Sequence, residues 1–207
     1  MAKSFPVLEP EFDLEEAKNV LGIPKTAPLD AATAAALEEL KTEARKIIEP
    51  RGVYEVIDIE VEKDRVFFLA PQKSYQIQSR RLAARLDGCS SAYVFAVTIG
   101  GQLEQRVSTY FQKGDYHRAL VLDAIGSALV EGLAESAQKY LAFLDESYEL
   151  TPRYSPGYGD LDLRVQAIFF EILEPEKIGI SLTKSYMMVP RKSVTAICGR
   201  TLTVSAK

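Results

Sequence analysis

Residues 92–99 read Ala92-Tyr93-Val94-Phe95-Ala96-Val97-Thr98-Ile99, an almost unbroken apolar run. The run is short, which favours a central β-strand over a buried helix. Gly100 and Gly101 end the strand, and the apolar spacing of residues 103–111 predicts an amphipathic helix after them. The turn between the two lacks the glycine and lysine patterns of nucleotide-binding loops. We therefore expect a plain strand-to-helix turn there rather than a phosphate site.

The N-terminal part of the chain predicts helices. Asp13 can cap a short helix, and residues 29–48 carry one apolar stripe at helical spacing. We expect residues 1–50 to form a helical extension that packs on the remainder of a single domain, residues 1–207.

The segment between this extension and the central strand predicts a hairpin and a helix. Residues 53–61 alternate in polarity as a half-buried strand does, and residues 66–69 return as the second strand. Residues 74–86 are predicted to form one helix, with apolar residues turned inward. Arg80, Arg81 and Arg85 would give it a basic face, which we expect to be solvated.

The longest predicted helix covers residues 116–146, with Asp115 as its N-cap. Gly126, Gly132 and Ser136 lie inside it, and each glycine there costs about 1 kcal/mol relative to alanine. Close approach of another element would explain these small residues. We therefore expect this helix to be central.

Residues 160–173 predict a further helix capped by Asp160, and short strands are expected at 181–182, 187–189 and 194–197. Helices and strands are mixed without a regular βαβ repeat. The sequence therefore predicts an α+β fold, a single domain in which several helices pack a largely antiparallel mixed sheet and one long helix is central.

Composition and charge argue against several classes of protein. The chain has a net charge of -4 and no basic block, so a nucleic-acid partner is not expected. Cys89 and Cys198 are far apart and His117 is the only histidine, which excludes a zinc ligand set and indicates a reducing cytoplasm. No secretory signal and no long apolar run are present, so we expect no membrane span.

The most unusual segment reads Arg153-Tyr154-Ser155-Pro156-Gly157-Tyr158-Gly159-Asp160. Its proline fixes one φ and its glycines can adopt positive φ, so the backbone can approach a ligand closely. Arg153 offers a planar fork that suits a carboxylate, and the tyrosines offer faces that suit an adenine or a sulfonium. An ordinary turn between two helices explains the same residues, and composition alone favours that turn.

Three motifs occur in order along the second half of the chain. They are Asp115-Tyr116 with the helix 124–135, the motif Arg153-x-x-Pro156-Gly157-Tyr158, and the segment Leu182-Thr183-Lys184-Ser185-Tyr186-Met187-Met188-Val189-Pro190. Together they resemble the activation domain of cobalamin-dependent methionine synthase. The family's loop commonly has an alanine between prolines and then Tyr-Pro-Ala, whereas this loop continues as Tyr158-Gly159-Asp160.

The resemblance implies that the loop binds S-adenosylmethionine (AdoMet). Arg153 would hold the carboxylate of the ligand, and Ser155 and Gly157 would offer backbone contacts. Tyr158 would line the methyl-sulfonium side, and Tyr186 would lie near the ligand. No catalytic acid or base is implied, because methyl transfer to a strong cobalt nucleophile requires positioning and charge.

The resemblance also implies partners. In the family, one electron and the methyl group of AdoMet restore a cobalamin whose cobalt has oxidised. The chain lacks the cobalamin motif Asp-x-His-x-x-Gly, so cobalamin would be supplied by a separate corrinoid-binding methionine synthase or other corrinoid protein, with a flavodoxin- or ferredoxin-type electron donor. The expectation is a stand-alone reactivation domain. Two alternatives stay open: a docking module for a corrinoid protein that no longer binds AdoMet, and an enzyme for another adenosyl or carboxylate ligand.

Overall fold

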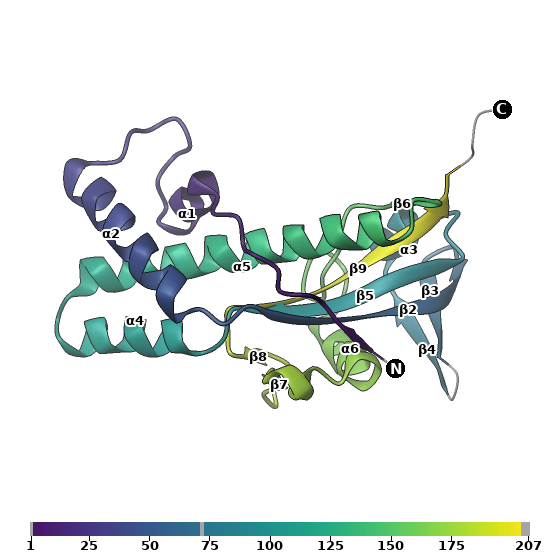
Figure 1. Cartoon of the computed structure of the whole chain (residues 1–207). Coiled ribbons are helices and arrows are strands. Elements are labelled where there is room, and N and C mark those ends of the chain that lie inside the picture. Colours follow the sequence, from purple (N-terminus) through teal and green to yellow (C-terminus); the bar gives the residue numbers. More distant parts are fainter. Residues whose placement is uncertain (1, 71–72, 204–207) are drawn as a thin grey trace.

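An antiparallel sheet of seven strands organises the computed structural model, which describes residues 2–70 and 73–203 (Figure 1). The strands are β1 (Lys3–Ser4), β2 (Arg51–Glu62), β3 (Arg65–Ala70), β4 (Lys73–Gln78), β5 (Ser91–Thr98), β6 (Tyr148–Leu150) and β9 (Ser193–Leu202). Their order is β4-β3-β2-β5-β9-β6, and β1 pairs with β2 beside this path. The predicted central strand is thus confirmed as β5, which lies between β2 and β9.

Strand β5 is apolar along its whole length because its side chains enter two cores in alternation. All of its residues are buried. Tyr93, Phe95 and Val97 face the core on one side of the sheet, whereas Val94 and Ala96 face the core on the other. A strand covered on both faces needs apolar side chains at successive positions, which is what the run 92–99 supplies.

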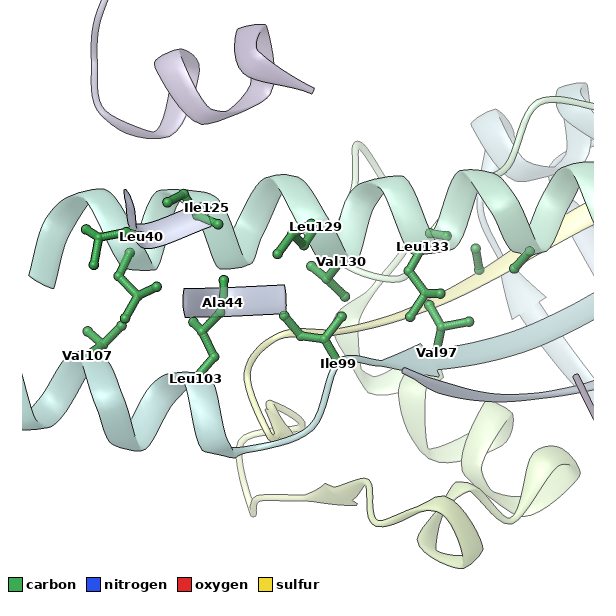
Figure 2. Close-up of a cluster of buried hydrophobic side chains, with 14 of the residues drawn as sticks. Leu40, Ala44, Val97, Ile99, Leu103, Val107, Ile125, Leu129, Val130 and Leu133 are labelled. Atoms are coloured by element: carbon green, nitrogen blue, oxygen red, sulfur yellow. The ribbon is translucent and has the colours of Figure 1, made fainter. Parts of the chain in front are cut away.

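The long helix α5 (Tyr116–Leu144) crosses one face of the sheet and packs with α1 (Leu14–Val20), α2 (Ala31–Ile47) and α4 (Gln102–Gln112) (Figure 1). Figure 2 shows the core where these elements meet, with Leu40 of α2, Leu103 of α4 and Ile125 of α5 packed together. Leu103 also lies over Gly126, where an added Cβ would be 2.6 Å from Leu103 Cδ2. The helix is central, as predicted, and ends two residues before the predicted boundary.

A second close approach explains the other small residues of α5. An N-terminal strap, which we define as residues 9–13, crosses the helix at Gly132 and Ser136. The carbonyl group of Glu11 occupies the space that a Cβ at Gly132 would need. The Ser136 hydroxyl donates to the Glu9 carbonyl at 3.0 Å. The missing side chain at Gly132 therefore lets one segment of backbone lie directly on another.

The opposite face of the sheet is covered by shorter helices. These are α3 (Arg80–Arg85), the 3-10 turn η1 (Leu163–Val165), α6 (Gln166–Leu173) and the 3-10 turn η2 (Pro175–Ile178). Leu82 of α3 and Phe169 of α6 are fully buried against this face, in one core with Val94 of β5. A small hairpin of β7 (Ser181–Leu182) and β8 (Met188–Val189) follows.

The prediction of one helix over residues 74–86 is wrong in its first half. Residues 73–78 form β4, which pairs antiparallel with β3 along its whole length. Ser79 then caps α3, accepting a hydrogen bond from the Leu82 N–H at 3.0 Å, so the helix begins at Arg80. Pairing with a neighbouring strand outweighs the weak local preference for a helix.

The α+β class, the antiparallel sheet and the long central helix are confirmed. Every strand pairing in the described residues is antiparallel. Across residues 2–70 and 73–203, no helix combines the length and the apolar character needed to cross a bilayer.

Candidate functional site

The Arg153 loop, residues 153–160, forms one wall of a groove of about 600 Å³. Helix α5 forms another wall, and α3 reaches the rim. The groove is lined by Arg85, Glu131, Gln138, Leu150, Pro152, Arg153, Tyr154, Ser155 and Tyr158. Four residues of the predicted loop thus meet two polar side chains of α5 at one surface.

Arg153 lines the groove and is held there by an ion pair with α5. One terminal nitrogen of its guanidinium lies 3.0 Å from Glu131 Oε2. The two side chains are 29% and 37% exposed, so solvent reaches both groups. A guanidinium carries five N–H donors in a planar fork, and this geometry lets Arg153 pair with a second carboxylate beside Glu131.

A second hollow of about 370 Å³ adjoins the groove on the other side of this ion pair. Arg153 and Glu131 line both spaces. The strap and the start of α1 contribute the acidic side chains Glu11, Asp13 and Glu16. The arrangement places a cationic fork next to a group of carboxylates, which suits a ligand that carries a carboxylate and an ammonium on one carbon atom.

Backbone pairing fixes the position of the loop. Tyr154 forms an antiparallel bridge with Ile197 of β9, with N–H to O distances of 3.0 and 2.9 Å. The Gly157 N–H donates to the Leu161 carbonyl at 2.8 Å. Gly157 and Gly159 have φ of 91° and 57°, the left-handed conformations predicted for them. The loop is therefore a shaped turn attached to the sheet edge.

Asp160 has a different partner from the one predicted. Its carboxylate accepts hydrogen bonds from the Ser79 hydroxyl at 2.6 Å and from the Arg80 N–H at 2.8 Å. These bonds hold the pKa of the Asp160 carboxyl below its ordinary value, with Ser79 as the largest cause. Asp160 therefore caps α3 and not the helix after it, whose first turn is capped by Asp162. The sequence pattern revealed a cap but could not reveal which helix is close in space.

The five predicted ligand residues occupy three places. Arg153, Ser155 and Tyr158 line the groove, and Tyr158 is 63% exposed at its rim. The N–H of Gly157 is engaged within the loop, which leaves its carbonyl group as the means of a ligand contact. Tyr186 lies in the turn between β7 and β8 with φ of 62°, and the described residues that line the groove do not include it.

Sequence reasoning missed the three polar side chains that helices α3 and α5 contribute to the groove. Glu131 and Gln138 stand seven positions apart on α5 and therefore share one face of the helix, a signal that the sequence does contain. Arg85 is exposed, as the predicted solvated face requires, and its guanidinium also lies over the Tyr154 ring, 4.8 Å from the centroid, because α3 packs next to the loop.

Other candidate residues have structural partners. The turn after β5 is closed by the Gly100 N–H, which donates to the Thr98 hydroxyl at 3.1 Å. His117 lies 3.1 Å from the hydroxyl of Thr33. Cys89 and Cys198 are buried, and burial raises the pKa of the Cys198 thiol to about 12. These features favour the plain turn that the sequence predicts after β5, and they place both cysteines inside the fold.

Comparison with known proteins identifies a family and a similar solved structure. The family described as "Vitamin B12 dependent methionine synthase, activation domain" matches residues 29–203. A solved structure described as "Crystal Structure of the MetH Reactivation Domain bound to AdoHcy" has the same fold, with a TM-score of 0.73 and 15% identity. The similarity covers 100% of this chain and 80% of that chain.

Proposed function

The chain belongs to the family of activation domains of vitamin B12-dependent methionine synthases, and on this basis we propose that its groove binds AdoMet and presents the methyl group to a corrinoid. The observation that carries the proposal is the position of Arg153. It stands where an open groove lined by tyrosines meets an acidic hollow. AdoMet has the matching parts in the matching order: an adenosyl group, a sulfonium, and an amino acid with both charges.

The amino-acid end of AdoMet would lie at Arg153. The guanidinium would pair with the ligand's carboxylate in the fork geometry that arginine favours. The ammonium would then face Glu131 and the strap residues Glu11 and Asp13, which line the adjoining hollow. Charge complementarity at both ends of one amino acid fixes its orientation as well as its affinity.

The adenosyl and sulfonium groups would lie along the groove beside the loop. Ser155 and the exposed Tyr158 line it, and Gly157, which lies between them in the sequence, would turn its carbonyl group towards the ligand. The face of an aromatic ring attracts a cation, so Tyr158 suits the methyl-sulfonium. We place Tyr186 at the far side of the bound ligand. For this contact to form, the β7–β8 turn that carries Tyr186 would have to move towards the ligand.

The work of the protein in this proposal is to position the methyl group. These 207 residues do not contain the Asp-x-His-x-x-Gly cobalamin motif, and in this proposal a methionine synthase or another corrinoid protein holds the corrinoid. The corrinoid would supply the nucleophile once one electron from a flavodoxin- or ferredoxin-type donor had reduced its oxidised cobalt, and S-adenosylhomocysteine would leave as the methyl group is transferred. Holding the two reacting atoms in line can contribute about 7–11 kcal/mol to such a step without an acid or base.

Calorimetry of the purified chain tests the proposal. AdoMet should bind saturably, and 5′-methylthioadenosine, which lacks the amino acid, should bind more weakly because it cannot reach Arg153. S-adenosylhomocysteine should bind as well, since it keeps the amino acid and the adenosyl group. Absence of heat with millimolar AdoMet would remove the methyl-transfer function.

A second candidate function is favoured by the ion pair itself. Because Arg153 already has a carboxylate partner at 3.0 Å, the groove can be stable without a ligand, as expected for a docking module that recognises a corrinoid protein. Co-purification with a corrinoid protein together with no AdoMet binding would support this module over the reactivation domain.

A further inference from the structure

The carbonyl group of Tyr158 is held from two sides. It accepts a hydrogen bond from the Tyr154 hydroxyl at 2.9 Å and another from the Leu161 N–H at 3.0 Å. The Tyr154 ring is buried, and its backbone is paired with β9. A hydroxyl that is fixed in this way sets the position of the peptide unit of Tyr158, and hence the direction in which its exposed ring leaves the chain.

Helix α3 holds the other end of the same loop. The Asp160 carboxylate caps its first turn, and the Arg85 guanidinium covers the ring of Tyr154. Between these contacts, Gly159 lies so close that an added Cβ would be 2.5 Å from the Tyr154 oxygen and 2.8 Å from Arg81 Cδ. The loop and α3 are therefore interlocked over residues that are about eighty positions apart in the sequence.

We propose that Tyr154 and Asp160 are positioning residues, which lock the Arg153 loop onto α3 so that Tyr158 is placed for the ligand before the ligand arrives. The inference rests on the proposed function of the groove and names the residues that prepare it. The Arg153 loop contains two glycines and would otherwise lose conformational freedom when the ligand binds, and this loss would weaken binding. Because Tyr154 and Asp160 order the loop as the chain folds, its conformational entropy is lost during folding and not during ligand binding.

Tyr154→Phe tests the first half of this lock because it removes one hydroxyl and keeps the ring. The Kd for AdoMet should rise about two- to tenfold, the effect of one hydrogen bond. The matched control is Tyr75→Phe, which removes a hydroxyl that donates to Glu171 at 2.8 Å, and neither of these residues lines the groove. The control should leave the Kd unchanged. Equal Kd values for the two variants would overturn the proposal.

A double-mutant cycle identifies the route of the effect. Tyr158→Ala removes the ring but leaves the carbonyl group that Tyr154 binds. If Tyr154 acts by placing this ring, Tyr154→Phe should have no further effect on the Kd in the Tyr158→Ala background. An undiminished effect there would mean that Tyr154 supports the fold in general, and the positioning role would be wrong.

Hydrogen exchange of the free protein tests Asp160 without any ligand. In Asp160→Asn, the amides of Gly157 and Leu161 should exchange faster, while amides of β5 keep their protection. Unchanged exchange at both loop amides would refute the role of Asp160. If the unmodified chain fails to bind AdoMet while the variant does show faster exchange, the proposed function fails but the lock between loop and helix stands.

Discussion

Replacing Arg153 by alanine separates the ligand role of this residue from its structural role. Loss of a hydrogen-bonded pair of charged groups costs about 1.5–3 kcal/mol, which corresponds to a rise in Kd of roughly 10- to 150-fold. The Arg153–Glu131 pair is about one-third exposed on each side, so solvent weakens it. The free energy of unfolding should therefore fall by only about 0–1 kcal/mol. The variant should stay folded and bind AdoMet much more weakly.

Titration calorimetry with two ligands checks the assignment. Decarboxylated AdoMet lacks the carboxylate that Arg153 would hold, so Arg153→Ala should lose affinity for AdoMet and not for this analogue. Arg164→Ala is the matched control, because Arg164 also pairs with a carboxylate, that of Asp162 at 2.5 Å, and the residues that line the groove do not include it. An equal loss with both ligands, or no loss with AdoMet, would refute a carboxylate contact at Arg153.

Three further substitutions test the fold around the groove. Gly132→Ala should reduce the free energy of unfolding by about 1–3 kcal/mol in urea titrations, because the added methyl group meets the Glu11 carbonyl; an unchanged midpoint would contradict the crossing of strap and helix. Ser79→Ala should destabilise the chain by about 0.5–2 kcal/mol, because α3 loses its cap and Asp160 loses a donor. The Cys198 thiol has a pKa raised to about 12 in the folded state, so its contribution to stability is complete below the unfolded pKa and decreases as pH rises above it. By pH 9.5 this loss should reach about 1.4 kcal/mol for an unfolded pKa near 8.5, and Cys198→Ala should remove that part of the pH dependence.

The parts of the fold that the sequence predicts well depend on local periodicity. The run 92–99 identifies β5 because a strand buried on both faces leaves no polar positions. The helix 116–146 is recognisable because its apolar face persists over many turns. The small residues Gly132 and Ser136 correctly indicate a close neighbour, but nothing in their spacing tells that the neighbour is the strap.

The parts that the sequence could not predict depend on contacts between distant segments. Local spacing favours a helix at residues 74–79, and only pairing with β3 makes this segment a strand. Asp160 has the residue type of a cap, yet the helix that it caps begins eighty residues earlier in the chain. The ion pair of Arg153 with Glu131 likewise joins two elements whose proximity comes from the sheet.

The distance between the two polar side chains of α5 has a consequence for ligand size. Glu131 and Gln138 line the same groove, and seven residues of helix rise by about 10.5 Å. A helical backbone neither stretches nor shortens appreciably, so this length is a fixed dimension of the binding surface. A compound that touches both side chains must span this rise less the reach of the two side chains. A nucleoside joined to an amino acid is longer than free methionine, so we expect selection by length to act alongside selection by charge if the proposed ligand binds.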